Sequence, residues 1–166
     1  MENDIFTAKQ LIAHGANINE ILPEGGYFYY GFGMTLMTDK IKTLGHLCAA
    51  KNDITTAREL LARGHNFEDD VFTPLHLSVF YAGLSGRATS LPFIKFLVEE
   101  AKVDVKAKVN LPQRYRRPKN GMTALDIAKA DHQPESKEMK DIYNYLCEMW
   151  HPEMSEDKMG NKEGCA

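Results

Sequence analysis

The sequence has no long hydrophobic run. Hydrophobic residues make up 43% of the 166-residue chain, yet no stretch approaches the roughly 18 apolar residues that a membrane-spanning helix needs. The N-terminus, Met1-Glu2-Asn3-Asp4, also lacks the basic start and the apolar core of a signal peptide. We therefore expect a soluble protein of the cytoplasm or nucleus, with no membrane association.

Cysteine is scarce and scattered. Cys48, Cys147 and Cys165 lie far apart, and their spacing fits no pair of metal ligands. A disulfide between two of them would leave one over, which favours a reducing compartment. The sequence also shows no glycine-rich phosphate loop. We therefore expect no metal and no cofactor.

A basic excess is missing as well. The chain carries 20 Lys and Arg residues against 23 Asp and Glu, a formal net charge of -3. Proteins that bind nucleic acid non-specifically usually have a marked basic excess, so nucleic acid is not the expected partner. The content of charged and hydrophobic residues is that of a folded domain, and the length fits one domain or one short repeat array.

What the sequence does contain is an internal repeat. Asn3-Asp4-Ile5-x-Thr7-Ala8-x-x-Leu11-x-Ala13-x-Gly15-x-Asn17 returns with the same spacing over residues 52–66. Each copy spaces its apolar and small residues as one helix face does and then stops at Gly15 or Gly64, which suits a left-handed helix C-cap. A looser third copy covers residues 91–100 and is followed by Val103-Asp104-Val105, in the place of Asn17-Ile18-Asn19.

A second motif precedes the third copy. It runs Thr73-Pro74-Leu75-His76, and the same frame fits Thr43-Leu44-Gly45-His46 and Gly121-Met122-Thr123-Ala124-Leu125. Threonine caps a helix start, proline fills a position that needs no amide donor, and small residues let paired helices approach. Together with Gly15-Ala16-Asn17-Ile18-Asn19, these motifs resemble the ankyrin repeat over roughly residues 3–149.

The resemblance implies an all-α fold, an ankyrin-repeat solenoid of stacked antiparallel helix pairs with loop or β-hairpin fingers. It divides residues 1–150 into a half unit at 1–20, an insertion at 20–42 and units near 43–72, 73–107 and 120–150, with a polar tail at 151–166. The chain thus starts inside a repeat. Either it is a fragment of a longer protein, or the residues from Glu20 onward cover the exposed end.

The resemblance also assigns structural roles to residues that could otherwise suggest chemistry. His46 and His76 fall at the structural histidine position of the motif, and Cys48 falls where a small buried residue belongs. A thiol nucleophile with a base would also need an orienting group, which no motif supplies. We therefore expect no enzyme activity. The structural motif residues are Thr43, His46, Thr73, Pro74, Leu75, His76, Gly121, Thr123, Ala124 and Leu125.

Insertions in a solenoid emerge as surface loops, which makes them candidate contact sites. The insertion at 20–42 holds five aromatic residues within six positions. Exposed rings anchor partner proteins well because they bury much area at little entropic cost. The alternative is that the loop folds back and these rings cover the N-terminal end of the core, which lacks its own helix. The residues are Tyr27, Phe28, Tyr29, Tyr30 and Phe32.

The second candidate is the segment 106–119, which contains six cations and no acidic residue. Forked guanidinium donors beside an aromatic ring suit an acidic protein surface or phosphate groups. Alternatively the segment is a solvated loop, paired with the acidic residues of the tail. The candidate residues are Arg114, Tyr115, Arg116, Arg117 and Lys119.

These features lead to a protein–protein interaction module that binds an unidentified partner protein through its concave face and inserted loops, and that is monomeric alone. A compact array with a polar tail resembles ankyrin proteins that intracellular bacteria deliver into host cells. A host-targeted effector and a signalling regulator therefore both stay open. The alternative function is a nucleic-acid or other polyanion contact through the basic loop 106–119, which would weaken steeply with salt.

Overall fold

The computed structural model describes residues 10, 12–15, 17–19, 43–68, 72–85, 90–110, 119–130 and 136–151. Within these ranges the chain is helical and contains no strand, which confirms the all-α prediction. The predicted β-hairpin fingers are therefore not seen in the described turns. The elements are α2 (Leu44–Lys51), α3 (Ile54–Ala62), α4 (Pro74–Ser85), α5 (Ser90–Lys95), the π-helical turn η2 (Phe96–Glu100), α6 (Ala124–Ala130) and α7 (Lys137–Trp150).

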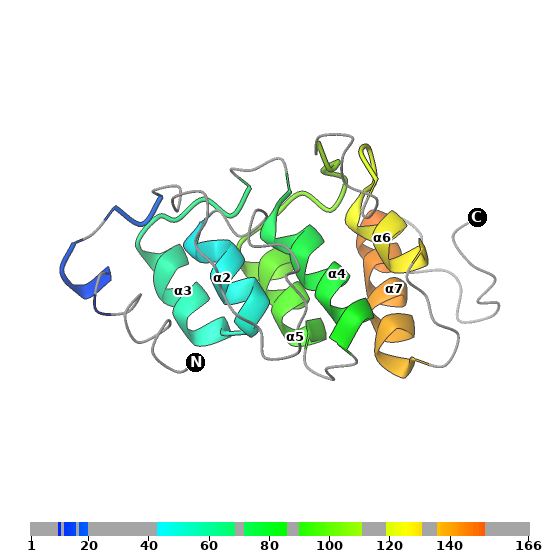
Figure 1. Cartoon of the computed structure of the whole chain (residues 1–166), viewed down its shortest axis with the longest axis horizontal. Coiled ribbons are helices and arrows are strands. Elements are labelled where there is room, and N and C mark those ends of the chain that lie inside the picture. The colour runs from blue at the N-terminus through cyan, green and yellow to red at the C-terminus, as the bar shows by residue number, and fades with distance from the viewer. Residues whose placement is uncertain are drawn as a thin grey trace.

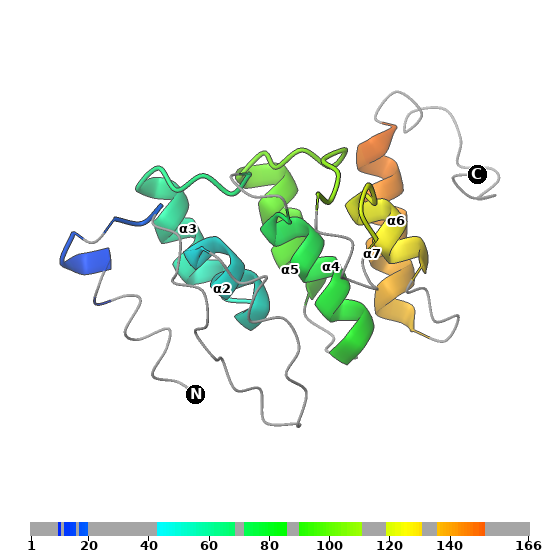
Figure 2. The ribbon, with the colours of Figure 1, turned by 45° about the horizontal axis from the view of Figure 1, so that its top comes forward.

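The described helices form pairs that stack side by side along the long axis of the molecule (Figure 1). α2 packs against α3, α4 against α5, and α6 against α7. α4 lies between α2 and α6, so the first helices of the pairs form one row and the second helices form another (Figure 2). We call each pair, with the turn that follows it, a unit.

Side-chain caps set where the second helices of the outer pairs begin. The Asp53 carboxylate accepts the N–H of Thr56 at 3.0 Å at the start of α3. The Ser136 hydroxyl accepts the N–H of Met139 at 3.3 Å at the start of α7. Each contact satisfies an amide that the first helical turn leaves unpaired.

Left-handed residues follow the second helices of the first two pairs, whereas α7 ends at His151 with φ of -124°. Gly64 has φ of 84°, which confirms the predicted C-cap, and Gly15 has φ of 79° in the N-terminal copy. In the third copy Lys102 takes the same role with φ of 58°. Glycine is the usual choice because the left-handed region costs other residues energy.

The core runs through all three pairs without a break. Residues 45–50 of α2 and 74–80 of α4 are buried on every side of their helices. α4 has no charged residue, as expected for a helix that is covered all round. The second helices, by contrast, keep a polar outer face. The largest fully buried side chains are Phe72, Phe93, Ile12, Leu60, Leu75, Leu77, Ile94, Leu97, Ile127, Met139 and Ile142.

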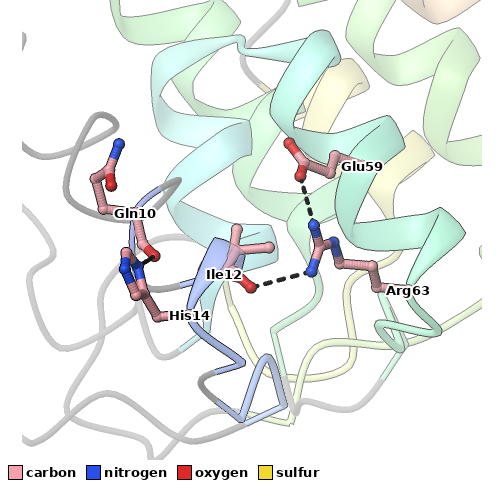
Figure 3. A network of polar contacts seen from close by, with 5 residues as sticks. All are labelled: Gln10, Ile12, His14, Glu59 and Arg63. Carbon is pink, nitrogen blue, oxygen red and sulfur yellow. Dashed lines mark hydrogen bonds and ion pairs between the residues drawn. The ribbon is translucent and has the colours of Figure 1, made fainter.

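Arg63 connects the N-terminal turn, residues 12–15, to α3 (Figure 3). Its guanidinium donates to the carbonyl oxygen of Ile12 at 3.0 Å and to the carboxylate of Glu59 at 3.0 Å. Nearby, the His14 Nδ1 lies 2.7 Å from the carbonyl oxygen of Gln10. The Ile12 carbonyl also accepts the Gly15 N–H at 3.1 Å, so Arg63 shares an acceptor at the end of this short helical turn.

We expect Arg63→Ala to destabilise the protein by about 1 kcal/mol, the usual worth of such a hydrogen bond. The loss should concentrate in the N-terminal turn, because Arg63 holds that turn to α3. Hydrogen–deuterium exchange over residues 12–19 should therefore accelerate, while exchange in α7 stays unchanged. Glu59→Gln is the control, since it leaves the Ile12 contact in place. Equal acceleration in both variants would contradict the assignment.

Candidate binding surface

The first two pairs open with the same threonine–histidine arrangement. Thr43 Oγ1 lies 2.9 Å from His46 Nδ1, and Thr73 Oγ1 lies 2.9 Å from His76 Nδ1. Each threonine oxygen also accepts the backbone N–H of its histidine, at 3.4 Å and 3.5 Å. The motif therefore caps its helix and orients an imidazole ring at the same time.

The far nitrogens of these rings reach to the following turn. His46 Nε2 bonds to the carbonyl oxygen of Phe72, and His76 Nε2 bonds to that of Ala107 at 3.0 Å. Because a carbonyl only accepts, Nε2 must carry the proton and Nδ1 must accept from threonine. Burial lowers the pKa of His76 to about 4, against a smaller opposing effect of the Ala107 bond. Both ring nitrogens of each histidine thus serve as links within the protein.

The third pair has Asp126 in place of histidine. The Thr123 N–H and hydroxyl donate to the Asp126 carboxylate at 2.9 and 2.8 Å. The Thr123 oxygen accepts the Asp126 N–H at 3.2 Å, which completes a reciprocal cap. A carboxylate cannot donate to a carbonyl, so the forward link of the two histidines has no counterpart at this position.

The other motif residues lie at the helix starts that the sequence predicts. Leu75 and Ala124 are buried and Leu125 is partly buried, while Pro74 is the first residue of α4. Gly121 has φ of 84° in the turn before α6. At Gly45, where the motif has leucine, an added Cβ would lie 2.7 Å from the His65 Nε2. The His65 ring therefore explains why position 45 holds glycine and not the leucine of the motif.

A second repeated feature, not predicted from the sequence, lies in the turns after the second helices. In each turn an asparagine or aspartate side chain accepts the N–H two residues further on, forming an Asx turn. The three Asx turns are Asn17–Asn19 at 3.1 Å, Asn66–Glu68 at 2.9 Å and Asp104–Lys106 at 2.8 Å.

These turns correct the register of the third copy. Asp104, not Val103, corresponds to Asn17, so the third turn comes one residue later than predicted. The cause is η2, where the Ala101 N–H bonds to the Phe96 carbonyl five residues back at 3.0 Å. Such a π-helical turn absorbs one extra residue within a helix. Periodicity of the apolar residues does not reveal it.

Neighbouring turns are also joined to one another. The Asn19 side chain accepts the N–H of Asn66 at 3.2 Å, and the Glu68 carboxylate accepts the N–H of Asp104 at 2.7 Å. Lys106 stands at the equivalent position of the third turn. Its ammonium lies instead over the Trp150 ring, 5.3 Å from the ring centre. The row of linked turns therefore ends with a cation against the last helix.

Two hydrogen bonds close the base of the basic loop. The Val109 N–H bonds to the Met122 carbonyl at 2.8 Å, and the Gly121 N–H bonds to the Val109 carbonyl at 2.7 Å. Lys108 and Lys119 flank this closure, and both side chains are exposed. Because these bonds hold the ends of the loop together, Lys108 and Lys119 lie on segments that are joined at its base.

No protein-family model, curated protein or solved structure matches this chain. Within the described ranges, no group of three or more His, Cys, Asp or Glu could hold a metal ion. No helix in those ranges is long and apolar enough to cross a membrane. A proposal about function therefore rests on the residues and contacts described above.

Most of the predicted contact residues lie outside the described part of the chain. This applies to Tyr27, Phe28, Tyr29, Tyr30, Phe32, Arg114, Tyr115, Arg116 and Arg117, and to the tail at 152–166. Lys119 alone among the predicted contact residues is described, and it is exposed. α2 and α4 offer little side-chain surface, since residues 45–50 and 74–80 are buried. The exposed cations of the candidate surface therefore lie in the turns and not in α2 or α4.

Lys106 and Lys108 belong to the predicted basic segment, and the structure adds Trp150 to this candidate surface. None of the described lysines at this surface forms an ion pair in the described part of the chain. The carboxylates of Glu68 and Asp126, by contrast, accept donors within the protein: Glu68 accepts the Asp104 N–H and Asp126 accepts from Thr123. The sequence indicated the two lysines through the acid-free basic segment. It carried no signal that Trp150 lies beside Lys106.

Proposed function

We propose that this chain is an ankyrin-type repeat array that binds a partner protein and performs no catalysis. The observation that carries the proposal is the threonine–histidine clamp, which occurs at both Thr43–His46 and Thr73–His76 and reaches the following turn each time. A single helix pair cannot bury its apolar face alone, so each pair is stable only when it stacks on a neighbouring pair. The equivalent linked turns add a second repeated contact.

The proposal places the binding function in loops and turns. Stacked helix pairs form a rigid support, and extra residues between them enlarge the surface that a partner meets. The sequence has such extra residues at 20–42 and between Ala107 and Asn120. The exposed lysines at the base of the second loop support a contact there, because unpaired cations favour an acidic partner surface.

Photo-crosslinking tests this proposal on the full chain. A photoreactive phenylalanine analogue would replace Tyr29, Lys108 or, as the control, Thr55 on the exposed face of α3. We expect one partner protein to be crosslinked from Tyr29 or Lys108 but not from Thr55, and to rebind saturably when purified. Crosslinking from Thr55 alone, or no saturable partner in any relevant cell extract, would contradict the proposal. The identity of the partner would separate a host-targeted effector from a signalling regulator.

A nucleic-acid contact through loop 106–119 is the alternative function, favoured by the same exposed lysines. It predicts affinity that falls steeply with salt, with a slope set by the few phosphates that the loop can reach. Gel-shift titrations at two salt concentrations measure that slope. No shift at low salt would remove this alternative and leave protein binding in place.

A further inference from the structure

The third turn differs from the others at the residue that links neighbouring turns. Asn19 and Glu68 both present an oxygen atom to the backbone N–H of the next turn. Lys106, at the same position, presents an ammonium group, which donates and cannot accept. The surface of this turn therefore suits a ligand that brings its own acceptor groups.

Two further cations belong to the segments that meet here. Lys108 is two residues after Lys106, and Lys119 lies in the turn that the Val109–Gly121 and Val109–Met122 bonds join to that segment. All three side chains are exposed. Like charges held together at a surface repel one another, and a ligand of opposite charge relieves that repulsion.

Trp150 supplies an apolar surface at the same place. Its ring is partly exposed at the C-terminal end of α7, with the Lys106 ammonium above it at 5.3 Å. An aromatic ring beside cations is a common anchor for a peptide, since it contributes buried area while the cations contribute orientation. The combination therefore indicates a ligand that is both acidic and partly apolar.

We infer that Lys106, Lys108, Lys119 and Trp150 form a docking surface for an acidic segment of a partner protein that carries an apolar side chain. This inference rests on the proposed binding function and specifies the chemistry of the partner. A long nucleic acid would extend from this surface onto exposed acids nearer the other end of α7, such as Asp141, in a chain with a formal net charge of -3. A short acidic segment does not reach that far.

The probe for this surface is a short synthetic peptide of alternating Asp and Glu with one central Phe. Because the chain contains 1 tryptophan, Trp150 fluorescence reports peptide binding at this surface directly. We expect a saturable change in emission with the full chain. Lys108→Glu with Lys119→Glu should weaken peptide binding by about tenfold or more, because the substitutions turn attraction into repulsion.

The matched control is Lys137→Glu with Lys140→Glu. It makes the same change in net charge at exposed positions near the other end of α7 and should leave peptide affinity within about twofold. Circular dichroism of both variants checks that they are folded. The inference is overturned if Trp150 emission does not respond, if both double variants lose affinity equally, or if an oligonucleotide of equal charge binds more tightly than the peptide.

Failure of this inference is distinguishable from failure of the proposed function. A crosslinked partner protein that binds the Lys108→Glu, Lys119→Glu variant with unchanged affinity would overturn the docking surface and leave the binding function standing. Absence of any saturable partner, together with binding of the acidic peptide, would contradict the proposed cellular function while leaving the surface chemistry supported.

Discussion

Replacing Phe93 with alanine is expected to destabilise the protein by about 3–5 kcal/mol, the usual cost of removing a fully buried aromatic side chain. Phe93 is 0% exposed, and its ring centre lies 5.7 Å from that of Phe96. It lies in α5, which packs against both α4 and α7. The cavity would therefore weaken the middle pair, on which the other two pairs stack.

Urea denaturation of the Phe93→Ala variant measures this loss. Helix content and Trp150 fluorescence should report the same earlier transition, because the pairs share one core. Thr55→Ala, at an exposed position of α3, is the control and should change stability by less than about 0.5 kcal/mol. A Phe93→Ala loss below about 1 kcal/mol would show that this core is not closely packed.

Acidification is expected to destabilise the protein through His76. Its pKa falls from 6.5 to about 4 on folding, mainly because the ring is buried. Between these values the unfolded chain binds a proton that the folded protein does not, so stability falls as pH decreases. The contribution is present above pH 6.5 and is lost as pH falls toward 4; from pH 7 to pH 5 the loss is about 2 kcal/mol.

The structural reason lies in the contacts of both ring nitrogens. A proton on Nδ1 would face the Thr73 N–H, a donor 3.2 Å away. The charged ring therefore cannot accept the hydrogen bond that the Thr73 N–H donates to the neutral ring. Denaturation midpoints at pH 7 and pH 5 test this, with His76→Gln as the comparison. The variant should be less stable at pH 7 and should show a smaller pH dependence. An unchanged pH dependence would assign the effect to other groups.

The candidate surface was only partly predictable. The basic segment 106–119 pointed to Lys119 as a contact residue, because a run of cations without acids is visible in the sequence alone. The closure at Val109 and the position of Lys106 over the Trp150 ring were not predictable. Those contacts join segments that carry no shared pattern, and the extra residue in η2 shifts the third turn away from the expected register.

The sequence by itself determined the helical class and where the first helices begin. Thr43, Thr73 and Thr123 each precede a helix by one residue. These helix starts are predictable because a capping residue and its partner are only three residues apart in the sequence. The left-handed C-cap at Gly64 was local in the same way.

Only the tertiary structure decided how the units are joined and which exposed groups gather. The bond from Asn66 to Asn19, the bond from Arg63 to Ile12 and the closure of the basic loop each connect residues far apart in the chain. Local propensity does not encode such contacts. They form when the apolar faces of the helices stack, which brings the turns to one edge and leaves the third turn with Lys106 and Trp150 together.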